Sequence, residues 1–395
     1  MQQYSHVLRK CTVIFFLCCI KFCLRGVLQS TYISLDYNEA QLLLQISTMV
    51  NIKLSAVCVI FAVAPALIAL STKHLAPTVQ WTPTVPFVTF SDGRRLAYEI
   101  RGDPSSKHTA IYIHGTPSCR LEFLGLRQGI LDSVGLRLVG VDKPGYGQSD
   151  PHYGRSLKSF VADLEQLADH LNLQRFLLIG VSGGGPYSWA TARYAPHRVQ
   201  GVLILSGAGN LGILDAQERA KFNAQVSGMH RRIANFFHST YSTPLKSLLS
   251  YLFETKIGGR QLYSTILKPL MRDPMRFMAD PDKDCLQQGH QEYTSRVVPE
   301  ALRQESATPW VQDLGLFSGD WGFNVSDIEP HVKPTIHLWH GTGDRQVSEV
   351  MTVAFKRLVP QATLRIIDGG AHFQYFVCNL KQQKEALAAL IQTST

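Results

Sequence analysis

Six short, nearly continuous apolar runs constrain the fold of this chain more than any other feature of its sequence. Runs of this length and composition are typical of strands that are buried on both faces of a sheet. Helical patterns lie between most of them, as in LKSFVADLEQLADHL (157–171), where apolar residues recur at helical spacing. Alternating strands and helices predict an α/β fold, with a mostly parallel sheet and helices on both faces. The runs are TAIYIHG (109–115), LRLVGVD (136–142), RFLLIGV (175–181), GVLILSG (201–207), TIHLWHG (335–341) and TLRIIDG (363–369).

The alternation starts after a hairpin and is interrupted once. PFVTF (86–90) and RRLAYEI (94–100) flank the turn residues Ser91-Asp92-Gly93. This arrangement predicts an antiparallel hairpin and brings the expected sheet to eight strands. Residues 208–329 are rich in helix formers and too long for an ordinary crossover, so we expect an inserted helical cap there. The resulting division is an N-terminal hydrophobic region (1–75), a linker (76–84), a core (85–207 and 330–395) and the cap (208–329).

The N-terminal region contains a candidate membrane anchor. Leu54–Leu70 is a run of 17 residues without a charge, bracketed by Lys53 and Lys73. This length is at the short end of what crosses roughly 30 Å of hydrocarbon. An earlier apolar stretch (12–24) resembles the core of a signal peptide, but Lys21 interrupts it. We therefore expect a single-pass anchor around Leu54–Leu70, with a buried core helix or secretion after signal cleavage as the alternatives.

Charge and cysteine placement exclude several classes of function. The chain has 39 Lys and Arg against 30 Asp and Glu, but no run of five or more like charges, so we expect no nucleic-acid partner. Outside the apolar N-terminal stretches, the cysteines Cys119, Cys285 and Cys378 are scattered, which does not suggest a disulfide framework. The sequence has no CxxC pair, no HExxH helix and no Gly-rich phosphate loop followed by the acidic residue that such a loop requires. We expect neither a metal nor a cofactor.

The nucleophile candidate follows an apolar run. Ligands of open α/β sheets bind beyond the carboxyl ends of the strands. There, Gly180-Val181-Ser182-Gly183-Gly184 forms the pattern G-x-S-x-G between an apolar run and a helical pattern. The pattern predicts a sharp turn that exposes the Ser182 hydroxyl. A plain Gly-rich turn is the alternative interpretation.

A serine nucleophile requires a base, and the base requires a group that fixes its tautomer. Asp344 and His372 follow the last two apolar runs, each behind glycines, in the chain order Ser, Asp, His that this arrangement of strands predicts. The alternatives are a turn-forming Asp and a structural His. Asp142 is the next candidate for the acid.

The reaction also requires two backbone N–H donors for an oxyanion. Gly183 follows the nucleophile directly and is one candidate. Thr116, in the turn His114-Gly115-Thr116-Pro117 after the first apolar run, is the other. We interpret His114 as a residue that braces this loop. The DKPGYGQSD loop (142–150) is expected to form a wall of the site.

Five motifs together resemble the α/β-hydrolase superfamily, within its large group of generic serine hydrolases. They are HGTPSCR, DKPGYGQSDP, GVSGGGPY, HLWHGTGDRQVS and GGAHF, in this order and spacing. The resemblance implies Ser182 as nucleophile, Asp344 as acid and His372 as base, with Thr116 and Gly183 as oxyanion donors. It departs at Lys143, where this group usually has Arg. Related dehalogenases and epoxide hydrolases have Asp at the position of Ser182, so the resemblance argues against both.

These features predict a membrane-anchored serine hydrolase that cleaves carboxylic esters, lipid esters included, through an acyl-enzyme. Its partners would be a small-molecule or lipid ester and the membrane. A ligand-binding receptor, an acyltransferase or a lyase on the same fold is the alternative. The sequon Asn324-Val325-Ser326 would report topology, because its glycosylation would place the catalytic region in the lumen or outside the cell.

Overall fold

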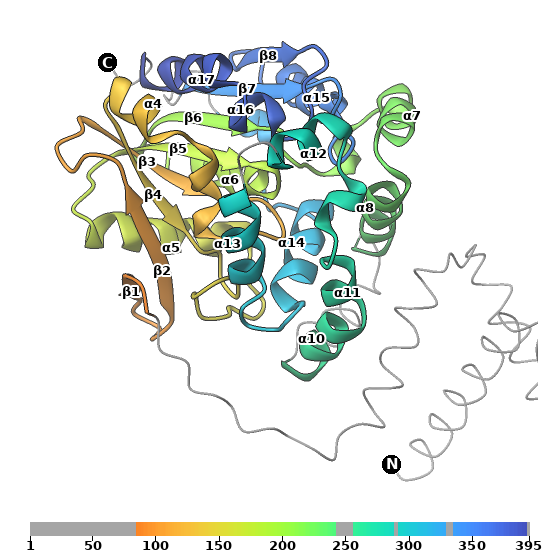
Figure 1. Ribbon diagram of the computed structural model, residues 1–395, viewed down its shortest axis with the longest axis horizontal. Helices are drawn as coiled ribbons and strands as arrows, with labels where there is room; N and C mark the ends of the chain where they lie inside the picture. The colour runs from red at the N-terminus through yellow and green to blue at the C-terminus, as the bar shows by residue number, and fades with distance from the viewer. Residues whose placement is uncertain (1–83, 242–255, 288–290, 329–334, 393–395) are drawn as a thin grey trace, which may run out of the picture. The chain divides into compact units, whose positions relative to one another are not determined.

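A twisted eight-stranded sheet forms the centre of the computed structural model, which describes residues 84–241, 256–287, 291–328 and 335–392 (Figure 1). The strand order is β1-β2-β4-β3-β5-β6-β7-β8. The pairs β1–β2 and β2–β4 are antiparallel, and every other neighbouring pair is parallel. This arrangement confirms the predicted mostly parallel α/β sheet. The strands are β1 Phe87–Thr89, β2 Arg95–Arg101, β3 His108–Ile113, β4 Leu136–Val141, β5 Phe176–Val181, β6 Val199–Leu205, β7 Thr335–Gly341 and β8 Thr363–Ile367.

The predicted hairpin is present. Phe87 pairs with Ala97 and Thr89 with Arg95. Gly93 in the connecting turn has φ +85°, in the left-handed region that glycine adopts without strain. The hairpin supplies the antiparallel edge of the sheet. Strands β3 to β7 are almost wholly buried, as their apolar runs predict. The same expectation is wrong for β8, which is fully buried only at Ile367 because it is the last strand in the order of the sheet.

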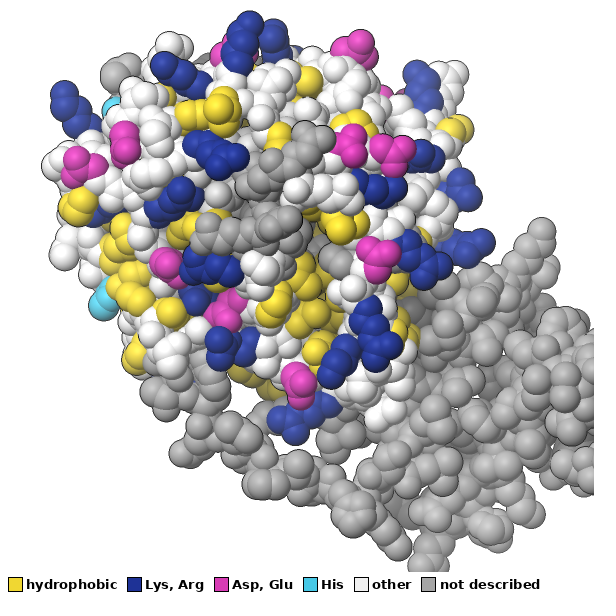
Figure 2. All heavy atoms as spheres, viewed as in Figure 1, with side chains coloured by type: hydrophobic (Ala, Val, Ile, Leu, Met, Phe, Trp, Pro, Cys, Tyr) yellow, Lys and Arg dark blue, Asp and Glu magenta, His cyan; other side chains and the backbone are white. Residues whose placement is uncertain are grey.

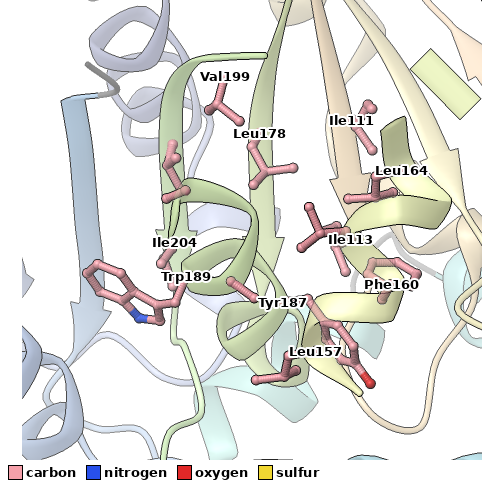
Figure 3. Close-up of a cluster of buried hydrophobic side chains, with 14 of the residues drawn as sticks. Ile111, Ile113, Leu157, Phe160, Leu164, Leu178, Tyr187, Trp189, Val199 and Ile204 are labelled. Carbon is pink, nitrogen blue, oxygen red and sulfur yellow. The ribbon is translucent and has the colours of Figure 1, made fainter. Parts of the chain in front are cut away.

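Alternate residues of the central strands enter two separate hydrophobic clusters, because successive side chains of a strand point to opposite faces. Ile111 and Ile113 of β3 belong to one cluster, whereas Ala110 and Tyr112 belong to the other. Helices α5 (Leu157–His170), α6 (Gly185–Tyr194) and α15 (Glu349–Leu358) pack on the first face, part of which Figure 3 shows. Helices α4 (Gln128–Ser133), α16 (Gln374–Val377) and α17 (Leu380–Gln392) pack on the second. The sheet is therefore covered on both faces.

The described segments between β6 and β7 are helical, and we call residues 208–329 the inserted region. Its helix α14 packs on α8, α12 packs on α16, and α13 packs on the 3₁₀ turn Arg120–Gly125 of the core. The inserted region therefore contacts the segments that follow β3 and β8. Its α-helices are α7 Ala216–Gln225, α8 Gly228–Tyr241, α10 Lys256–Leu262, α11 Lys268–Leu270, α12 Asp280–Gln287, α13 Gln291–Ala301 and α14 Thr308–Ser318.

One disulfide joins the inserted region to the core. Cys285 of α12 is bonded to Cys378, which follows α16, across 93 residues of sequence. The scattered cysteines did not suggest a disulfide framework, so this bond was not predicted from the sequence. Only the packing of α12 on α16 brings the two residues together. Cys119 is free and buried.

The N-terminal region belongs to a separate unit, Met1–Pro77, and the predicted anchor Leu54–Leu70 lies outside the described residues. Among the residues that are described, no helix is both long enough and apolar enough to cross a membrane.

On the face shown in Figure 2, basic side chains are spread among acidic and neutral ones.

Candidate active site

Ser182 lies in a sharp turn between β5 and α6. Its φ of +51° is in the left-handed region, which a residue with a side chain rarely adopts. A Cβ atom at Gly180 would lie 2.1 Å from Ser188 Oγ, and one at Gly184 would lie 2.2 Å from the Ile113 carbonyl oxygen. Both positions therefore require glycine, and the strand–turn–helix geometry is the one that G-x-S-x-G predicts.

Asp344 and His372 are joined by a short hydrogen bond. The His372 Nδ1–H donates to Asp344 Oδ2 over 2.6 Å, and both side chains are buried. The other oxygen, Asp344 Oδ1, accepts the backbone N–H groups of Gln346 (2.8 Å) and Val347 (3.0 Å). With its proton on Nδ1, the His372 ring presents an unprotonated Nε2, which is the atom a general base requires.

The pKa values of the pair are displaced in opposite directions. Burial alone would raise the pKa of Asp344, but the charge of His372 and hydrogen bonds from His340 and His372 outweigh it and hold that pKa well below its usual range. Burial alone would lower the pKa of His372, but the Asp344 carboxylate, with smaller contributions from Asp282 and Glu122, raises it above its ordinary value. Protonation of His372 is therefore favoured in the presence of Asp344, as stabilisation of an imidazolium intermediate requires.

Ser182 follows β5 and His372 follows β8, so both lie beyond the carboxyl ends of parallel strands, with β6 and β7 between them in the sheet. The Ser206 hydroxyl, at the end of β6, donates to the His372 carbonyl oxygen (2.6 Å), and the Ala208 N–H donates to the Ser182 carbonyl oxygen (2.8 Å). The end of β6 thus connects the two loops. These two described side chains share no hydrogen bond with each other; catalytic hydrogen bonds often tighten only when substrate binds.

The two expected oxyanion donors lie side by side. A Cβ atom at Gly183 would lie 2.4 Å from Thr116 Oγ1. The N–H of Gly115 is occupied, since it donates to Glu122 Oε2 over 2.8 Å. The Thr116 N–H has no acceptor among the described residues, and Gly183 stands in the first turn of a helical segment, where N–H groups lack helical partners. The geometry favours Thr116 rather than Gly115 as the second donor.

A buried ion cluster lies behind Thr116. The Thr116 hydroxyl donates to Asp313 Oδ2 (2.5 Å) and accepts from Lys143 Nζ (2.7 Å), which also contacts Asp313 Oδ2 (2.7 Å). Burial lowers the pKa of Lys143 to about 8. Burial would raise the pKa of Asp313, but Lys143 and Arg155 bring it down to about 2. Asp313 belongs to α14, so the cluster fixes the inserted region to the loop that contains Thr116 (114–117), which we call the oxyanion loop after its expected role. Its other members are Arg155, Tyr146 and Tyr187, all donors to Asp313.

Ser182, Gly183 and Thr116 line a cavity of about 130 Å³ between the core and the inserted region. Most of the remaining lining is apolar. A cavity of this kind can orient a small, largely apolar group against the Ser182 hydroxyl. The apolar lining consists of Ala208, Leu211, Phe222, Ile233, Ala234, Leu314, Phe317, Val347 and Met351.

His230 of α8 is a polar member of that lining which the sequence analysis missed. Its Nδ1 lies 2.7 Å from the Ser227 hydroxyl. Burial, followed by the charge of His372, lowers the pKa of His230 to about 4. The ring is therefore neutral near pH 7. No motif surrounds His230 in the sequence, so only the packing of α8 reveals it.

Three further residues brace the site and were not predicted from the sequence. His340 lies in β7, and its Nε2 is 3.1 Å from Asp344 Oδ2 and 2.9 Å from the Val347 carbonyl oxygen. Glu122 is buried, which raises its pKa, and it holds the Gly115 N–H. Asp282 of α12 accepts a hydrogen bond from the backbone N–H of His372.

His114 braces its loop as expected. Its Nδ1 contacts the Gly115 carbonyl oxygen, and its Nε2 accepts the backbone N–H of Lys143.

Asp142, the reserve candidate for the acid, is committed elsewhere. Its carboxylate accepts from the Arg120 side chain (2.7 Å) and from the backbone N–H groups of Arg120 (2.6 Å) and Gln148 (2.7 Å). It therefore fixes the wall loop rather than His372. In the part of the chain that the structure describes, no three His, Cys, Asp or Glu side chains are grouped as metal ligands.

The fold and this site define a class of protein. A family model described as alpha/beta hydrolase fold matches residues 111–377, which is more than half of the chain. The chain belongs to this family.

Individual relatives share about a quarter to a third of the aligned residues with this chain. A 2-hydroxy-6-oxononadienedioate/2-hydroxy-6-oxononatrienedioate hydrolase of Cupriavidus pinatubonensis is 26% identical over 208 residues, which cover 49% of this chain and 72% of the relative. A non-heme chloroperoxidase of Streptomyces lividans is 32% identical over 121 residues, 30% of this chain and 43% of the relative. The chain spans about half the length of several curated relatives that it matches. A thermophilic esterase from Thermogutta terrifontis is similar in fold, with a TM-score of 0.51, 18% identity, and coverage of 79% of this chain and 100% of the esterase.

Proposed function

We propose that this protein is a serine hydrolase that cleaves small carboxylic esters through an acyl-enzyme intermediate. The observation that carries the proposal is the Asp344–His372 hydrogen bond at the same end of the sheet as the Ser182 turn. The Asp–His pair supplies an oriented base, and the turn supplies a hydroxyl at the wall of a cavity. Serine nucleophiles in this arrangement transfer acyl groups.

In the first half of the proposed reaction, His372 Nε2 takes the proton of the Ser182 hydroxyl while Oγ forms a bond to the ester carbonyl carbon. The carbonyl electron pair moves onto oxygen, which the N–H groups of Thr116 and Gly183 stabilise. The bond to the alkoxy group then breaks, and the proton passes from His372 to the leaving alcohol. Asp344 stabilises the imidazolium at both stages.

In the second half, water replaces the alcohol. His372 takes a proton from water, the resulting hydroxide attacks the acyl carbon, and the bond to Ser182 Oγ breaks as the proton returns to the serine. The product is the free carboxylic acid, and the enzyme is regenerated.

The cavity supports a short acyl or alcohol group as the preferred substrate part. Its volume of about 130 Å³ and its mostly apolar lining suit a small hydrocarbon group better than a long acyl chain. The relatives are named for different reactions, among them a hydrolase and a chloroperoxidase, so membership of the family does not by itself select the reaction.

A panel of p-nitrophenyl esters of increasing chain length, with a fluorophosphonate probe, tests the proposal. We expect turnover of short esters, labelling at Ser182, and loss of both in Ser182→Ala, whose activity should fall by about 10³- to 10⁶-fold. Turnover retained in Ser182→Ala would contradict the assignment of the nucleophile. Labelling of Ser182 without turnover of any ester would favour a receptor, an acyltransferase or a lyase.

A further inference from the structure

Asp282 is a fully buried carboxylate of the inserted region that holds the start of the loop carrying His372. Its Oδ2 accepts the backbone N–H of His372 over 3.0 Å. Its Oδ1 accepts the N–H groups of Phe373 (3.1 Å) and Gln374 (2.9 Å). These three consecutive donors stand at the beginning of α16, where a helix leaves its N–H groups without helical partners. Hydrogen bonds from backbone N–H groups to an ionised carboxylate are stronger than those between neutral groups.

Cys285 holds the other end of the same segment. It follows Asp282 by three residues, so both side chains lie on one face of α12. Its disulfide partner Cys378 stands directly after α16. Helix α12 is therefore attached at both ends of residues 372–378, by a carboxylate at the start and by a covalent bond at the end.

Asp282 also contributes to the electrostatic surroundings of the His372 ring. After Asp344, its carboxylate is the next charge that raises the pKa of His372. Burial raises the pKa of Asp282 itself, and the charge of His372 opposes that rise. Among the described residues, titratable groups from several elements surround His372 and its partner Asp344. Asp344 after β7, Glu122 in the 3₁₀ turn, Asp282 in α12 and His230 in α8 interact with His372 itself. His340 in β7 and Tyr375 in α16 interact with Asp344.

We propose that helix α12 positions the catalytic base, with Asp282 as a positioning residue for His372 and the Cys285–Cys378 disulfide as the covalent tie that keeps α12 in place. The proposal rests on the proposed role of His372 as general base. The inserted region then has two functions: it covers the cavity, and it sets where the base lies and how readily the base takes a proton.

The test compares Asp282→Asn with Asp280→Asn in the full chain. Asp280 belongs to the same helix but is exposed, and it forms a surface ion pair with Lys283. An amide at position 282 keeps one acceptor oxygen, but its NH₂ group would face one of the backbone N–H donors. For Asp282→Asn we expect kcat for p-nitrophenyl acetate to fall about 10- to 100-fold at unchanged KM, as a small misplacement of a catalytic group would cause. Here kcat is calculated per active site, with the active sites counted by fluorophosphonate titration. The acidic limb of kcat/KM should move to lower pH. Asp280→Asn should match the wild type in both respects.

A second variant keeps the test decisive if Asp282→Asn folds poorly. Cys285→Ser with Cys378→Ser removes the covalent tie and leaves Asp282 in place. It should lower the melting temperature and reduce kcat per active site, and the His372 ring, followed by NMR, should titrate over a broadened or lowered pH range. Wild-type kcat and pH profile in both variants would overturn the proposal. The proposal would also be overturned if activity fell only in proportion to the number of active sites that fluorophosphonate labels. That outcome indicates a structural role for Asp282 and the disulfide.

If Ser182→Ala retained ester turnover, the function itself would be wrong. The NMR titration of His372 in Asp282→Asn would still decide whether Asp282 acts on the ring, and an unchanged titration would reject the positioning role.

Discussion

The core and the inserted region hold the residues of the candidate site by different means. In the core, Ser182, Asp344 and His372 follow the ends of β5, β7 and β8, where the backbone of the sheet and glycine-dependent turns fix them. Asp282 and Asp313 belong to helices of the inserted region. Their own buried carboxylates bind groups in loops of the core. Sheet geometry therefore places the groups that we propose to react, whereas, under our proposal, buried charges in the inserted region set how accurately two of the core loops are placed.

Two of the contacts between the inserted region and the core reach residues of the proposed site. Helix α14 contacts the oxyanion loop through Asp313 and Thr116, and α12 contacts the base loop through Asp282 and His372. Both acids are buried, but Asp313 is matched by two cations, Lys143 and Arg155, while Asp282 is matched by backbone N–H groups. A change at Asp313 should thus affect stability first, and a change at Asp282 should affect the pH profile first.

The largest effects should come from the core. His372→Ala should reduce ester turnover as severely as Ser182→Ala, because members of a triad act as a unit, and Asp344→Asn should be somewhat less damaging. In the wild type, the raised pKa of His372 should place the acidic limb of kcat/KM above about pH 6.5, the ordinary value for histidine. Activity rises with pH through this limb, since the base must be neutral.

Removing the Asp344 charge lowers the pKa of His372, so the limb of Asp344→Asn should move to lower pH. Measurement of kcat/KM between pH 5 and pH 9 tests both expectations. A silent Asp344→Asn would mean that the acid lies elsewhere. Asp142 is poorly placed to replace it, because its carboxylate is bound by Arg120 and Gln148.

The next largest effect is expected at the ion cluster. Asp313→Asn leaves Lys143 and Arg155 buried without their counter-charge, and losing one partner of a buried pair typically costs about 3 to 5 kcal/mol of unfolding free energy. The melting temperature should fall, and kcat should fall with it because the Thr116 hydroxyl loses its carboxylate acceptor. Asp320→Asn, an exposed acid shortly after α14, is the control. Equal melting temperatures for the two variants would show that the cluster does not anchor α14.

The strands and the three motif residues of the core could be predicted because their signals are local. G-x-S-x-G next to an apolar run specifies the Ser182 turn, and the glycines before Asp344 and His372 mark the other strand ends. Asp282 and Asp313 carry no such signal, since they occur in helical stretches like ordinary surface acids. Their partners lie 90 and 197 residues away in sequence, and the two disulfide cysteines lie 93 residues apart. Only tertiary packing distinguishes these acids from solvated ones.

A smaller effect is expected at the wall of the cavity. His230→Phe keeps an aromatic ring in α8 but removes its hydrogen-bonding nitrogens from the cavity. Loss of one neutral hydrogen bond to substrate is worth about 0.5 to 1.5 kcal/mol, so kcat/KM should fall by about 2- to 12-fold for esters with a polar group, and less for plain alkyl esters. His238→Phe, a less buried position of the same helix, is the control. Because the pKa of His230 is about 4, the ratio of variant to wild type should stay constant from pH 6 to 8. A ratio that varied over this range would show that His230 titrates during catalysis.

The smallest effect on catalysis should come from the N-terminal region. The unit that contains the site begins at Thr78 and its first strand at Phe87, so deletion of residues 1–75 removes no part of either. We expect the deletion to leave kcat/KM on soluble esters unchanged and to change the location of the protein in the cell.

Each Leu, Ile, Val or Phe favours membrane insertion by about 0.3 to 0.6 kcal/mol at a helix centre. The run Leu54–Leu70 should therefore retain the full-length protein in the membrane pellet during a carbonate wash at high pH. The deletion variant should be released into the supernatant. The Cys285–Cys378 disulfide and the exposed Asn324 of the sequon both favour a lumenal or extracellular catalytic unit, because disulfides persist in oxidising compartments. A mobility shift on endoglycosidase treatment, absent in Asn324→Gln, would support that side. If carbonate releases the full-length protein, the run is no anchor, and the core and the inserted region must reach their substrate without one.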